Sequence, residues 1–325
     1  MTNKGQRLVE LTAQFWQLGI NQQIDYDKFY LYSLITHSTA IEGSTVTEVE
    51  NQLLFDEGIS AKGRSISEQL MNLDLKAAYE QSIVYAKLHT DITVDLLKQL
   101  SSIVMKNTGS TYNTALGSFS STNGDLRLLN VTAGVGGRSY MNYTKVPAKL
   151  IEFCERLNLQ RKDITQLDLV QRYILSFDAH FHLVTIHPWA DGNGRMSRLL
   201  MNQLQFECDL IPTKIDKSRK AEYIESLIAT RESDDLDIFR NYMLDEHIRN
   251  LESMIHNYQI SMEPKETTIT NVPVNVPVNV PVNVPVNVPV NLSERQKQIL
   301  YLMKNNTTIT IHQLSEELNV NERTI

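Results

Sequence analysis

A tandem repeat of Asn-Val-Pro-Val runs from Asn271 to Val290 and limits where this 325-residue chain can build a globular core. Because proline fixes φ and lacks a backbone N–H, proline at every fourth position excludes an α-helix and disfavours a central β-strand. We therefore expect an extended, fairly stiff spacer, which would reach roughly 60 Å at about 3.1 Å per residue. The repeat separates a long N-terminal part, where we expect the main core, from a short tail.

The composition narrows the class of protein. Cys154 and Cys208 are the only cysteines, too few for a disulfide framework or a zinc site. A net charge of −7 gives no global attraction to nucleic acid or anionic membranes. The sequence shows neither a signal-peptide pattern nor an apolar run approaching the ~20 residues of a membrane span. We therefore expect a cytoplasmic protein without a membrane partner.

Residues 166–184 carry apolar side chains at steps of three and four, which predicts a helix with one buried face. These side chains belong to Leu167, Val170, Ile174, Phe177, Phe181 and Val184. His187 precedes Pro188, and a residue before proline is disfavoured in the α region. We expect the helix to end near His187 and to leave its imidazole at the edge of a loop.

That loop reads His-Pro-Trp-Ala-Asp-Gly-Asn-Gly-Arg from His187 to Arg195. Gly192 and Gly194 allow a tight turn and a close approach of backbone N–H groups to a ligand. A second apolar helical run begins near Arg195, so the loop leads into a helix N-terminus, which favours anions. Arg195 and Arg198 can share one face of the first turn. Two cations there oppose the helix dipole unless a polyphosphate binds, which indicates a phosphate-handling site.

The stretch resembles the signature of the Fic-domain family, HPFxDGNGRxxR, with Trp189 in place of phenylalanine. Fic proteins mostly transfer AMP from ATP to a hydroxyl group of a target protein. The resemblance implies that His187 is the general base and that Asp191 holds Mg²⁺ on the phosphates. These roles suit the chemistry, because imidazole titrates near neutral pH and Mg²⁺ prefers carboxylates plus phosphate oxygens. The resemblance assigns the remaining phosphate contacts to Gly192, Asn193, Gly194, Arg195 and Arg198.

Residues 38–43 read Ser-Thr-Ala-Ile-Glu-Gly and resemble the inhibitory pattern (S/T)xxxE(G/N) of the same family. Ser38 and Glu42 share a face if the segment is helical, and Gly43 suits a helix C-terminus. The resemblance implies that Glu42 forms a salt bridge with a signature arginine, for which we expect Arg195, and blocks the ATP γ-phosphate. The alternative is an ordinary helix end with a solvated glutamate. Some relatives use this glutamate to remove AMP, so the direction of the reaction stays open.

Residues 128–140 combine a β-favouring run with a Gly-rich turn, which predicts a β-hairpin. In Fic domains a hairpin flap at this place aligns the target by strand addition, which needs free backbone groups. An unpartnered hairpin is the alternative. Upstream, Gly124 to Arg127 resembles a Gly-x-x-Arg pattern before the flap, although Gly117 could take the glycine's place. The flap residues implied by the resemblance are Val135, Gly136, Gly137, Arg138 and Tyr140.

Residues 219–235 resemble the helix that follows the signature, in which an aromatic side chain lines the adenine pocket. Tyr223 is the matching position, with an ordinary core or surface tyrosine as the alternative. His180 lies on the apolar face of the predicted helix 166–184, which favours a structural role over catalysis.

The tail from Leu292 to Ile325 resembles the first half of a winged helix-turn-helix. DNA binding normally needs a positive face, but the four basic and four acidic residues of this segment balance. DNA binding is therefore weakly supported, and a protein-docking or vestigial module fits as well. The charged residues are Arg295, Lys297, Lys304 and Arg323 against Glu294, Glu316, Glu317 and Glu322.

Together these patterns predict a mainly α, Fic-type helical bundle with a β-hairpin flap. We expect an N-terminal helical region with the inhibitory helix at 1–92, a catalytic domain at 93–262, a spacer at 263–291 and a helix-turn-helix-like segment at 292–325. The predicted function is a self-inhibited protein adenylyltransferase that uses ATP and Mg²⁺ to modify a tyrosine, serine or threonine of a target protein or of itself. The alternatives are a deAMPylase or other Fic-type nucleotidyl- or phosphotransferase, and a nucleotide-sensing transcription regulator. Homo-oligomerisation is left open.

Overall fold

The structure is a computed structural model that describes residues 3–132 and 139–262, together with the single tail positions 298, 302, 313, 317 and 318. Met1–Pro264 form one compact unit, so the regions predicted at 1–92 and 93–262 lie within the same unit. The predicted spacer at 263–291 and nearly all of the predicted helix-turn-helix segment lie outside the described residues. The DNA-binding alternative therefore stays a prediction from sequence.

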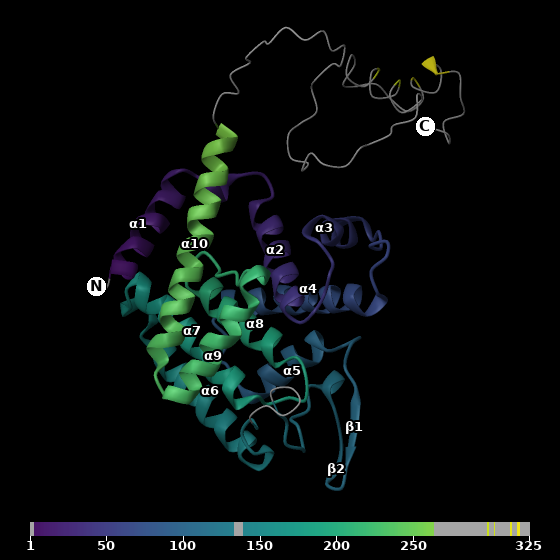
Figure 1. Cartoon of the computed structure of the whole chain (residues 1–325), viewed down its shortest axis with the longest axis vertical. Coiled ribbons are helices and arrows are strands. Elements are labelled where there is room, and N and C mark those ends of the chain that lie inside the picture. Colours follow the sequence, from purple (N-terminus) through teal and green to yellow (C-terminus); the bar gives the residue numbers. More distant parts are fainter. Residues whose placement is uncertain are drawn as a thin grey trace. The chain divides into compact units, whose positions relative to one another are not determined.

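Helices dominate the described part of the chain, which confirms the mainly α prediction (Figure 1). One short antiparallel hairpin accompanies them, with Thr111 opposite Ser120. The elements are α1 (Asn3–Gln17), η1 (Ile20–Gln22), α2 (Tyr26–Ile41), α3 (Glu48–Glu57), α4 (Ile66–Lys87), α5 (Val94–Val104), β1 (Thr111–Thr114), β2 (Gly117–Ser120), η2 (Ser121–Asn123), η3 (Tyr143–Lys145), α6 (Val146–Lys162), η4 (Ile164–Gln166), α7 (Leu169–Ile186), α8 (Asn193–Glu207), η5 (Lys217–Arg219), α9 (Lys220–Ser233) and α10 (Leu236–Met262).

The pair α7 and α8 forms the centre of the bundle, with α4 packed on α8 and α6 on α7. At the other side, α10 runs beside α1 (Figure 1). Two apolar clusters meet at α7: Leu175 and Leu183 join the cluster shared with α4, α5 and α6, whereas Phe177 and Val184 join the cluster shared with α1 and α10. A helix that is apolar on several faces is a buried helix. Helix α7 is therefore packed on both sides, which fixes the position of the loop that follows it.

The boundaries of α7 agree closely with the predicted helix. It begins at Asp168, whose carboxylate accepts a hydrogen bond from the Gln171 N–H at 2.8 Å in a capping box. It ends at His187, which adopts a left-handed conformation with φ 54° and ψ 61°. The predicted stop before Pro188 is confirmed, because this residue cannot continue the helix.

The described hairpin is not the predicted one. β1 and β2 lie upstream, where Tyr112 stacks on Phe119 with ring centroids 5.0 Å apart. At the predicted place, Thr132 and Ser139 form an isolated antiparallel bridge, and residues 133–138 between them lie outside the described residues. The predicted flap positions Val135 to Arg138 are therefore not covered by the structure. No helix in the described ranges combines the length and apolarity needed to cross a bilayer.

Candidate active site

His187 stands at the junction of α7 and the signature loop. Its backbone N–H donates to the Leu183 carbonyl at 3.1 Å, and its Nδ1 lies 3.3 Å from the Val184 carbonyl. A left-handed conformation is unfavourable for a residue with a Cβ atom and is found more often at functional sites than elsewhere. Because Nδ1 faces the Val184 carbonyl at the end of α7, Nε2 is the ring nitrogen that can accept a proton.

The imidazole of His187 is neutral at physiological pH. Burial lowers the pKa of His187 to about 4; the hydrogen bond to the Val184 carbonyl opposes this shift, and the nearby positive charges of Arg127 and Arg231 add to it. A neutral imidazole can act as a general base, whereas a protonated one cannot. His187 therefore has the protonation state that its predicted role requires.

Tyr140 covers the His187 ring. The two rings stack with centroids 3.7 Å apart and an interplanar angle of 15°. The guanidinium of Arg231, on α9, lies 5.3 Å from the Tyr140 ring centroid and makes a cation–π contact with it. The structure thus brings one predicted flap residue directly against the predicted base.

The signature loop is closed by Trp189 and Asn193. The Trp189 N–H donates to Asn193 Oδ1 at 3.1 Å, and Asn193 Nδ2 donates to the Trp189 carbonyl at 2.9 Å. The buried indole of Trp189 also donates from Nε1 to the Gly124 carbonyl at 3.2 Å. A phenylalanine could not make this last contact, so the departure from the family signature adds a hydrogen bond. The Asn193 side chain shapes the loop, while its backbone lies at the start of α8.

Gly124 and Gly192 each adopt a left-handed conformation in or beside this loop. At Gly124 a Cβ would lie 1.9 Å from the Lys98 carbonyl oxygen, and at Gly192 it would lie 2.8 Å from Met105 Sδ. Both positions therefore require glycine for close packing as well as for backbone conformation.

Arg195 is a buried cation without a full set of partners. Its side chain is 3% exposed, and Nε and Nη1 have no hydrogen-bond partner among the described residues. Nη2 contacts Met105 Sδ at 3.1 Å and lies 3.7 Å from the Asp191 carboxylate. Burial lowers the pKa of Arg195. Buried N–H groups without acceptors cost free energy, so this guanidinium is suited to receive an anion.

Asp191 is the residue that could hold a divalent cation. Its side chain is 57% exposed, and Oδ1 accepts a hydrogen bond from the Gly192 N–H at 2.6 Å. The described residues contain no cluster of three His, Cys, Asp or Glu side chains that would bind a metal alone. Mg²⁺ is commonly held by one or two carboxylates together with phosphate oxygens and water. Asp191 fits that arrangement when a nucleotide supplies the other ligands.

Arg198 is already occupied by the segment predicted to be inhibitory. Its Nη2 donates to Glu42 Oε1 at 2.5 Å and to the Ser38 carbonyl at 3.0 Å, and its Nε donates to Ser38 Oγ at 2.8 Å. The expectation that Glu42 pairs with Arg195 was wrong. Arg198 lies one turn further along α8, facing the end of α2, whereas Arg195 turns toward Met105.

The electrostatics of Glu42 follow from this pair. Burial alone would raise the pKa of Glu42, but the charge and hydrogen bond of Arg198 outweigh burial and hold the pKa below its ordinary value. Glu42 Oε1 also lies 2.5 Å from the point where a Cβ on Gly194 would be. The Glu42 carboxylate therefore lies directly over the start of α8, and a side chain at Gly194 would displace it from this position.

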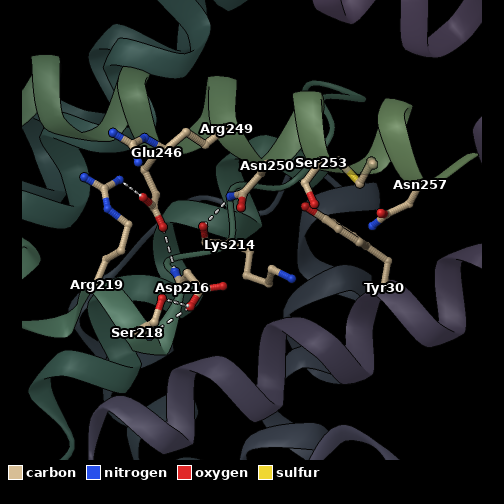
Figure 2. A pocket seen from close by; sticks show the side chains of 11 residues that line it. Tyr30, Lys214, Asp216, Ser218, Arg219, Glu246, Arg249, Asn250, Ser253 and Asn257 are labelled. Carbon is tan, nitrogen blue, oxygen red and sulfur yellow. Dashed lines mark hydrogen bonds and ion pairs between the residues drawn. The ribbon is translucent and has the colours of Figure 1, made fainter. Parts of the chain in front are cut away.

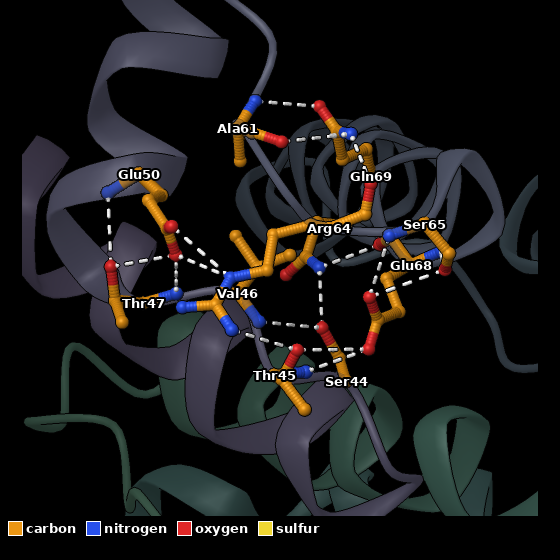
Figure 3. A network of polar contacts seen from close by, with 11 residues as sticks. Ser44, Thr45, Val46, Thr47, Glu50, Ala61, Arg64, Ser65, Glu68 and Gln69 are labelled. Carbon is orange, nitrogen blue, oxygen red and sulfur yellow. Dashed lines mark hydrogen bonds and ion pairs between the residues drawn. The ribbon is translucent and has the colours of Figure 1, made fainter.

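The segment after Glu42 is fastened to α3 and α4 by polar contacts (Figure 3). Gly43 follows with a φ of 106°, which turns the chain out of α2. Thr45 donates from its backbone N–H to Glu68 Oε1 at 3.1 Å, and Arg64 pairs with Glu50 at 3.1 Å. Each of these glutamates also completes a capping box, at the start of α4 and α3 respectively.

A network of buried hydrogen bonds around an amide side chain also holds this segment in place. Asn72 Oδ1 accepts from Thr39 Oγ1 at 2.7 Å and from Asn51 Nδ2 at 2.9 Å, while Asn72 Nδ2 donates to Ser44 Oγ at 3.1 Å. Asn72 is fully buried. It thereby joins α2, α3 and α4 with the turn that follows Glu42.

The opposite side of α2 borders a polar cavity of about 330 Å³ (Figure 2). Tyr30 donates to the Pro212 carbonyl at 2.6 Å, and Lys214 Nζ donates to Ser33 Oγ at 3.0 Å. Figure 2 shows Asn250, one of the residues that α10 adds to this cavity. These contacts tie α2 to the segment between α8 and α9.

Tyr223 lies deeper than an adenine contact would suggest. It is 1% exposed, and its hydroxyl lies 2.8 Å from Nε2 of the buried His180. Burial lowers the pKa of His180 to about 3, so this histidine is neutral and packed within the core. The nearby Tyr223 hydroxyl is one of the groups that raise the pKa of Arg198 against the effect of burial. The predicted adenine contact of Tyr223 stays a prediction, since its ring is closed off in this structure.

The sequence analysis missed the part that Arg127 plays. This arginine is 1% exposed, and it donates from Nε to the His187 carbonyl at 2.8 Å and from Nη1 to the Leu129 carbonyl at 2.8 Å. Its Nη2 donates to the Met141 carbonyl. Arg127 thus holds the end of α7 and both sides of the 128–140 segment. The Gly-x-x-Arg pattern was the only signal, and it carries no information about these carbonyl partners.

Comparison with known proteins adds sequence relatives to this geometry. Residues 91–205 match the model of the Fic/DOC family. The protein adenylyltransferase fic-1 of Caenorhabditis elegans is 25% identical over 247 residues, which is 75% of this chain and 44% of that protein. The protein adenylyltransferase Fic of Drosophila erecta is 30% identical over 204 residues, 62% of this chain and 37% of that protein. The chain spans less than half the length of these relatives.

Two solved structures have a similar fold. A Fic-domain-containing signalling protein from Bacteroides thetaiotaomicron gives a TM-score of 0.65 at 20% identity, covering 78% of this chain and 97% of the other. A fragment of Fic-1 from Caenorhabditis elegans gives a TM-score of 0.63 at 21% identity, covering 79% of this chain and 73% of the fragment. These likenesses support the helical fold with its small hairpin.

Proposed function

Because residues 91–205 match the Fic/DOC family, we propose that the chain is a protein adenylyltransferase that transfers AMP from ATP to a hydroxyl group. The acceptor would be a tyrosine, serine or threonine of a target protein or of the chain itself. The observation that carries the proposal is a neutral His187 next to a loop whose Arg195 has buried N–H groups with no partner among the described residues. The first can accept a proton, and the second can stabilise the charge of a triphosphate.

The reaction follows from these positions. The acceptor oxygen attacks the α-phosphorus of ATP, a new O–P bond forms, and the bond from the α-phosphorus to the bridging oxygen of the β-phosphate breaks. Pyrophosphate leaves, and the hydroxyl proton passes to Nε2 of His187. A magnesium ion held by Asp191 would supply positive charge at the phosphate oxygens. The backbone N–H groups at the start of α8 and the Arg195 guanidinium orient the phosphates.

We further propose that the chain inhibits itself through Glu42. Arg198 is the second signature arginine and would contact the γ-phosphate, but Glu42 and Ser38 occupy its guanidinium. A phosphate at the same place would meet the negative charge of Glu42, which Arg198 keeps ionised. Productive binding of ATP therefore requires that the contact between Glu42 and Arg198 opens.

The test is transfer of label from α-³²P-ATP in the presence of Mg²⁺, without added target, by the wild type and by Glu42→Gly in parallel. We expect strong self-labelling by the variant and little by the wild type. A variant that binds ATP but labels nothing would contradict the proposed transfer. Equal labelling by both chains would leave transfer intact and contradict self-inhibition.

Removal of AMP from a modified protein is the second candidate. The observation that favours it is the position of the Glu42 carboxylate directly above Gly194 at the start of α8, where it could orient a water toward a phosphate. The low pKa of Glu42 opposes this role while Arg198 is its partner, because a weakly basic carboxylate is a poor general base. A labelled, AMP-modified acceptor would distinguish the reactions, since only the second releases AMP in a Glu42-dependent way.

A further inference from the structure

A cavity of about 750 Å³ lies between the 139–142 segment, the start of α6, the end of α7 and α9. We call it the acceptor groove and define it by Tyr140, Met141, Lys145, Lys149, Ile228 and Arg231. None of the residues that would hold ATP lines it. We therefore expect the groove to bind a molecule other than ATP.

The acceptor groove has an apolar wall and a basic rim. Met141 and Ile228 supply aliphatic surface, and Ile228 remains 41% exposed. Lys145, Lys149 and Arg231 supply three positive charges, against the single carboxylate of Glu232 among the lining residues. The whole chain carries a net charge of −7, so the groove has the opposite sign to the molecule. A groove of one sign attracts a partner of the other sign.

The basic side chains of the rim are accessible to a ligand. Lys145 and Lys149 are exposed. Lys149 pairs with Glu152 at 2.6 Å, and because the two side chains are 50% and 59% exposed, this ion pair is easily exchanged for one with another carboxylate. The Arg231 guanidinium lies 5.3 Å from the Tyr140 ring centroid, and its Nε donates to the Leu227 carbonyl at 3.2 Å, which leaves the two Nη groups to face a ligand.

The groove adjoins the reacting centre through one aromatic ring. Tyr140 lines the groove and stacks on the His187 imidazole at 3.7 Å. Thr185, on the same wall, precedes His187 by two residues. In an extended peptide, side chains at positions i and i+2 point to the same side about 7 Å apart. A peptide whose hydroxyl reaches His187 can thus place its second neighbour in the groove.

On the basis of the proposed function, we infer that the acceptor groove selects the target. It binds an acidic segment of the target protein that carries an apolar side chain two residues from the hydroxyl that receives AMP. The groove takes no part in bond formation. It should therefore lower the KM for the acceptor and leave the KM for ATP unchanged.

The test uses the full chain with Glu42→Gly and three sets of synthetic peptides, each made with tyrosine, serine and threonine as acceptor. One set has acidic flanks with leucine two residues from the hydroxyl, the second replaces the acidic flanks by lysine, and the third replaces leucine by glycine. We expect kcat/KM for the first set to exceed the second about tenfold, because three exposed ion pairs worth about twofold each multiply. This preference should shrink as salt rises from 0.05 to 0.5 M.

A charge reversal provides the sharper readout. The double change Lys145→Glu with Lys149→Glu should shift the preference toward the lysine-flanked peptides, with ATP affinity and melting temperature as controls for folding. Lys87→Glu, an exposed lysine at the end of α4, is the matched control and should leave the preference unchanged.

Two results would overturn the inference: equal use of acidic and basic peptides, or strong self-labelling with no labelling of any peptide. A Glu42→Gly chain that transfers no AMP to any acceptor, itself included, would instead count against the proposed function. The two failures are therefore distinguishable.

Discussion

His187 and Arg127 show how much of the site depends on single residues. His187 ends α7 in a left-handed conformation, and Arg127 holds its carbonyl at 2.8 Å. The same guanidinium binds carbonyls on both sides of the 128–140 segment, so His187 and Tyr140 are positioned together. The orientation of His187 is therefore set by its neighbours as much as by its own backbone.

Replacing His187 should separate chemistry from binding. We expect His187→Asn to abolish AMP transfer while ATP affinity stays near that of the parent, because asparagine tolerates the left-handed conformation but cannot serve as a base. Calorimetric titration with ATP and labelling with α-³²P-ATP, both in the Glu42→Gly background, make the comparison. A loss of ATP binding would assign His187 a structural role instead.

Arg127→Lys tests the positioning role. Lysine keeps the charge but cannot bridge three carbonyls with a rigid fork. We expect kcat in the Glu42→Gly background to fall on the order of tenfold to a hundredfold, as expected when a catalytic group is displaced, with the KM for ATP little changed. Circular dichroism would confirm folding, and an unchanged kcat would show that His187 holds its place without Arg127.

The pH profile should reflect the lowered pKa of His187. An ordinary imidazole is half protonated near pH 6.5, whereas burial lowers the pKa of His187 to about 4. We expect kcat/KM to stay level from pH 8 to about 5 and to fall only as the pH approaches 4, with the folded fraction followed by circular dichroism. A decline centred near 6.5 would show that the base is solvated in the working enzyme.

At the scale of elements, the C-terminal part of α2 is held in place by polar contacts on two sides. Its end is held by Asn72 and the α3–α4 network on one side and by Lys214 on the other. Helix periodicity and the stop before Pro188 predicted α7 and α8 well, because those signals are local. The partner of Glu42 was mispredicted, because which arginine faces α2 depends on how α8 is rotated in the bundle. The hairpin at 111–120 was missed because four-residue polar strands carry little apolar alternation.

Loosening α2 should release the inhibition without touching Glu42. In Asn72→Ala, the buried groups of Thr39, Asn51 and Ser44 lose a shared partner, which costs free energy in the closed arrangement. We expect self-labelling to rise severalfold above the wild type while remaining below Glu42→Gly. Gln99→Ala, which removes only an exposed contact with Tyr85, is the control. Unchanged labelling with a lowered melting temperature would limit Asn72 to a structural role.

At the scale of the whole molecule, the described residues up to Met262 form one compact unit. Both apolar clusters of the described residues lie in the part of the chain that precedes the Pro-rich repeat. What the sequence could not reveal is that the regions at 1–92 and 93–262 share one core, since the contact between α1 and α10 joins segments more than 200 residues apart.

A chain ending at Met262 should retain catalysis. All residues proposed for ATP and for the acceptor precede that point, and the truncated chain would keep α10 from Leu236 to Met262. We expect the truncated Glu42→Gly chain to label itself at a rate within about twofold of the full-length Glu42→Gly chain, unless the modified residue lies in the tail, which labelling of peptides would reveal. An inactive but folded truncation would contradict the proposed boundary.

Acid should destabilise the fold over a defined window. Burial lowers the pKa of both His180 and His247 to about 3, whereas the unfolded chain binds these protons near pH 6.5. The stabilisation of the fold by these two neutral histidines is complete above about pH 6.5. It is lost as the pH falls toward 3, because the unfolded chain then binds more protons than the folded one. We expect the melting temperature to fall through this range, and less steeply in His247→Gln. A pH-independent melting temperature between 6.5 and 4 would contradict this.

Under the proposed self-inhibition, the contact between Glu42 and Arg198 would make the activity of the chain depend on the concentration of nucleotide. One guanidinium cannot serve a carboxylate and a phosphate together, so in the proposed mechanism the closed Glu42–Arg198 contact and ATP compete for the same group. If one molecule in a hundred is open, the apparent dissociation constant for ATP rises about a hundredfold above its intrinsic value. In this mechanism, every change that weakens the contacts of α2 with its neighbours lowers the ATP concentration at which transfer begins.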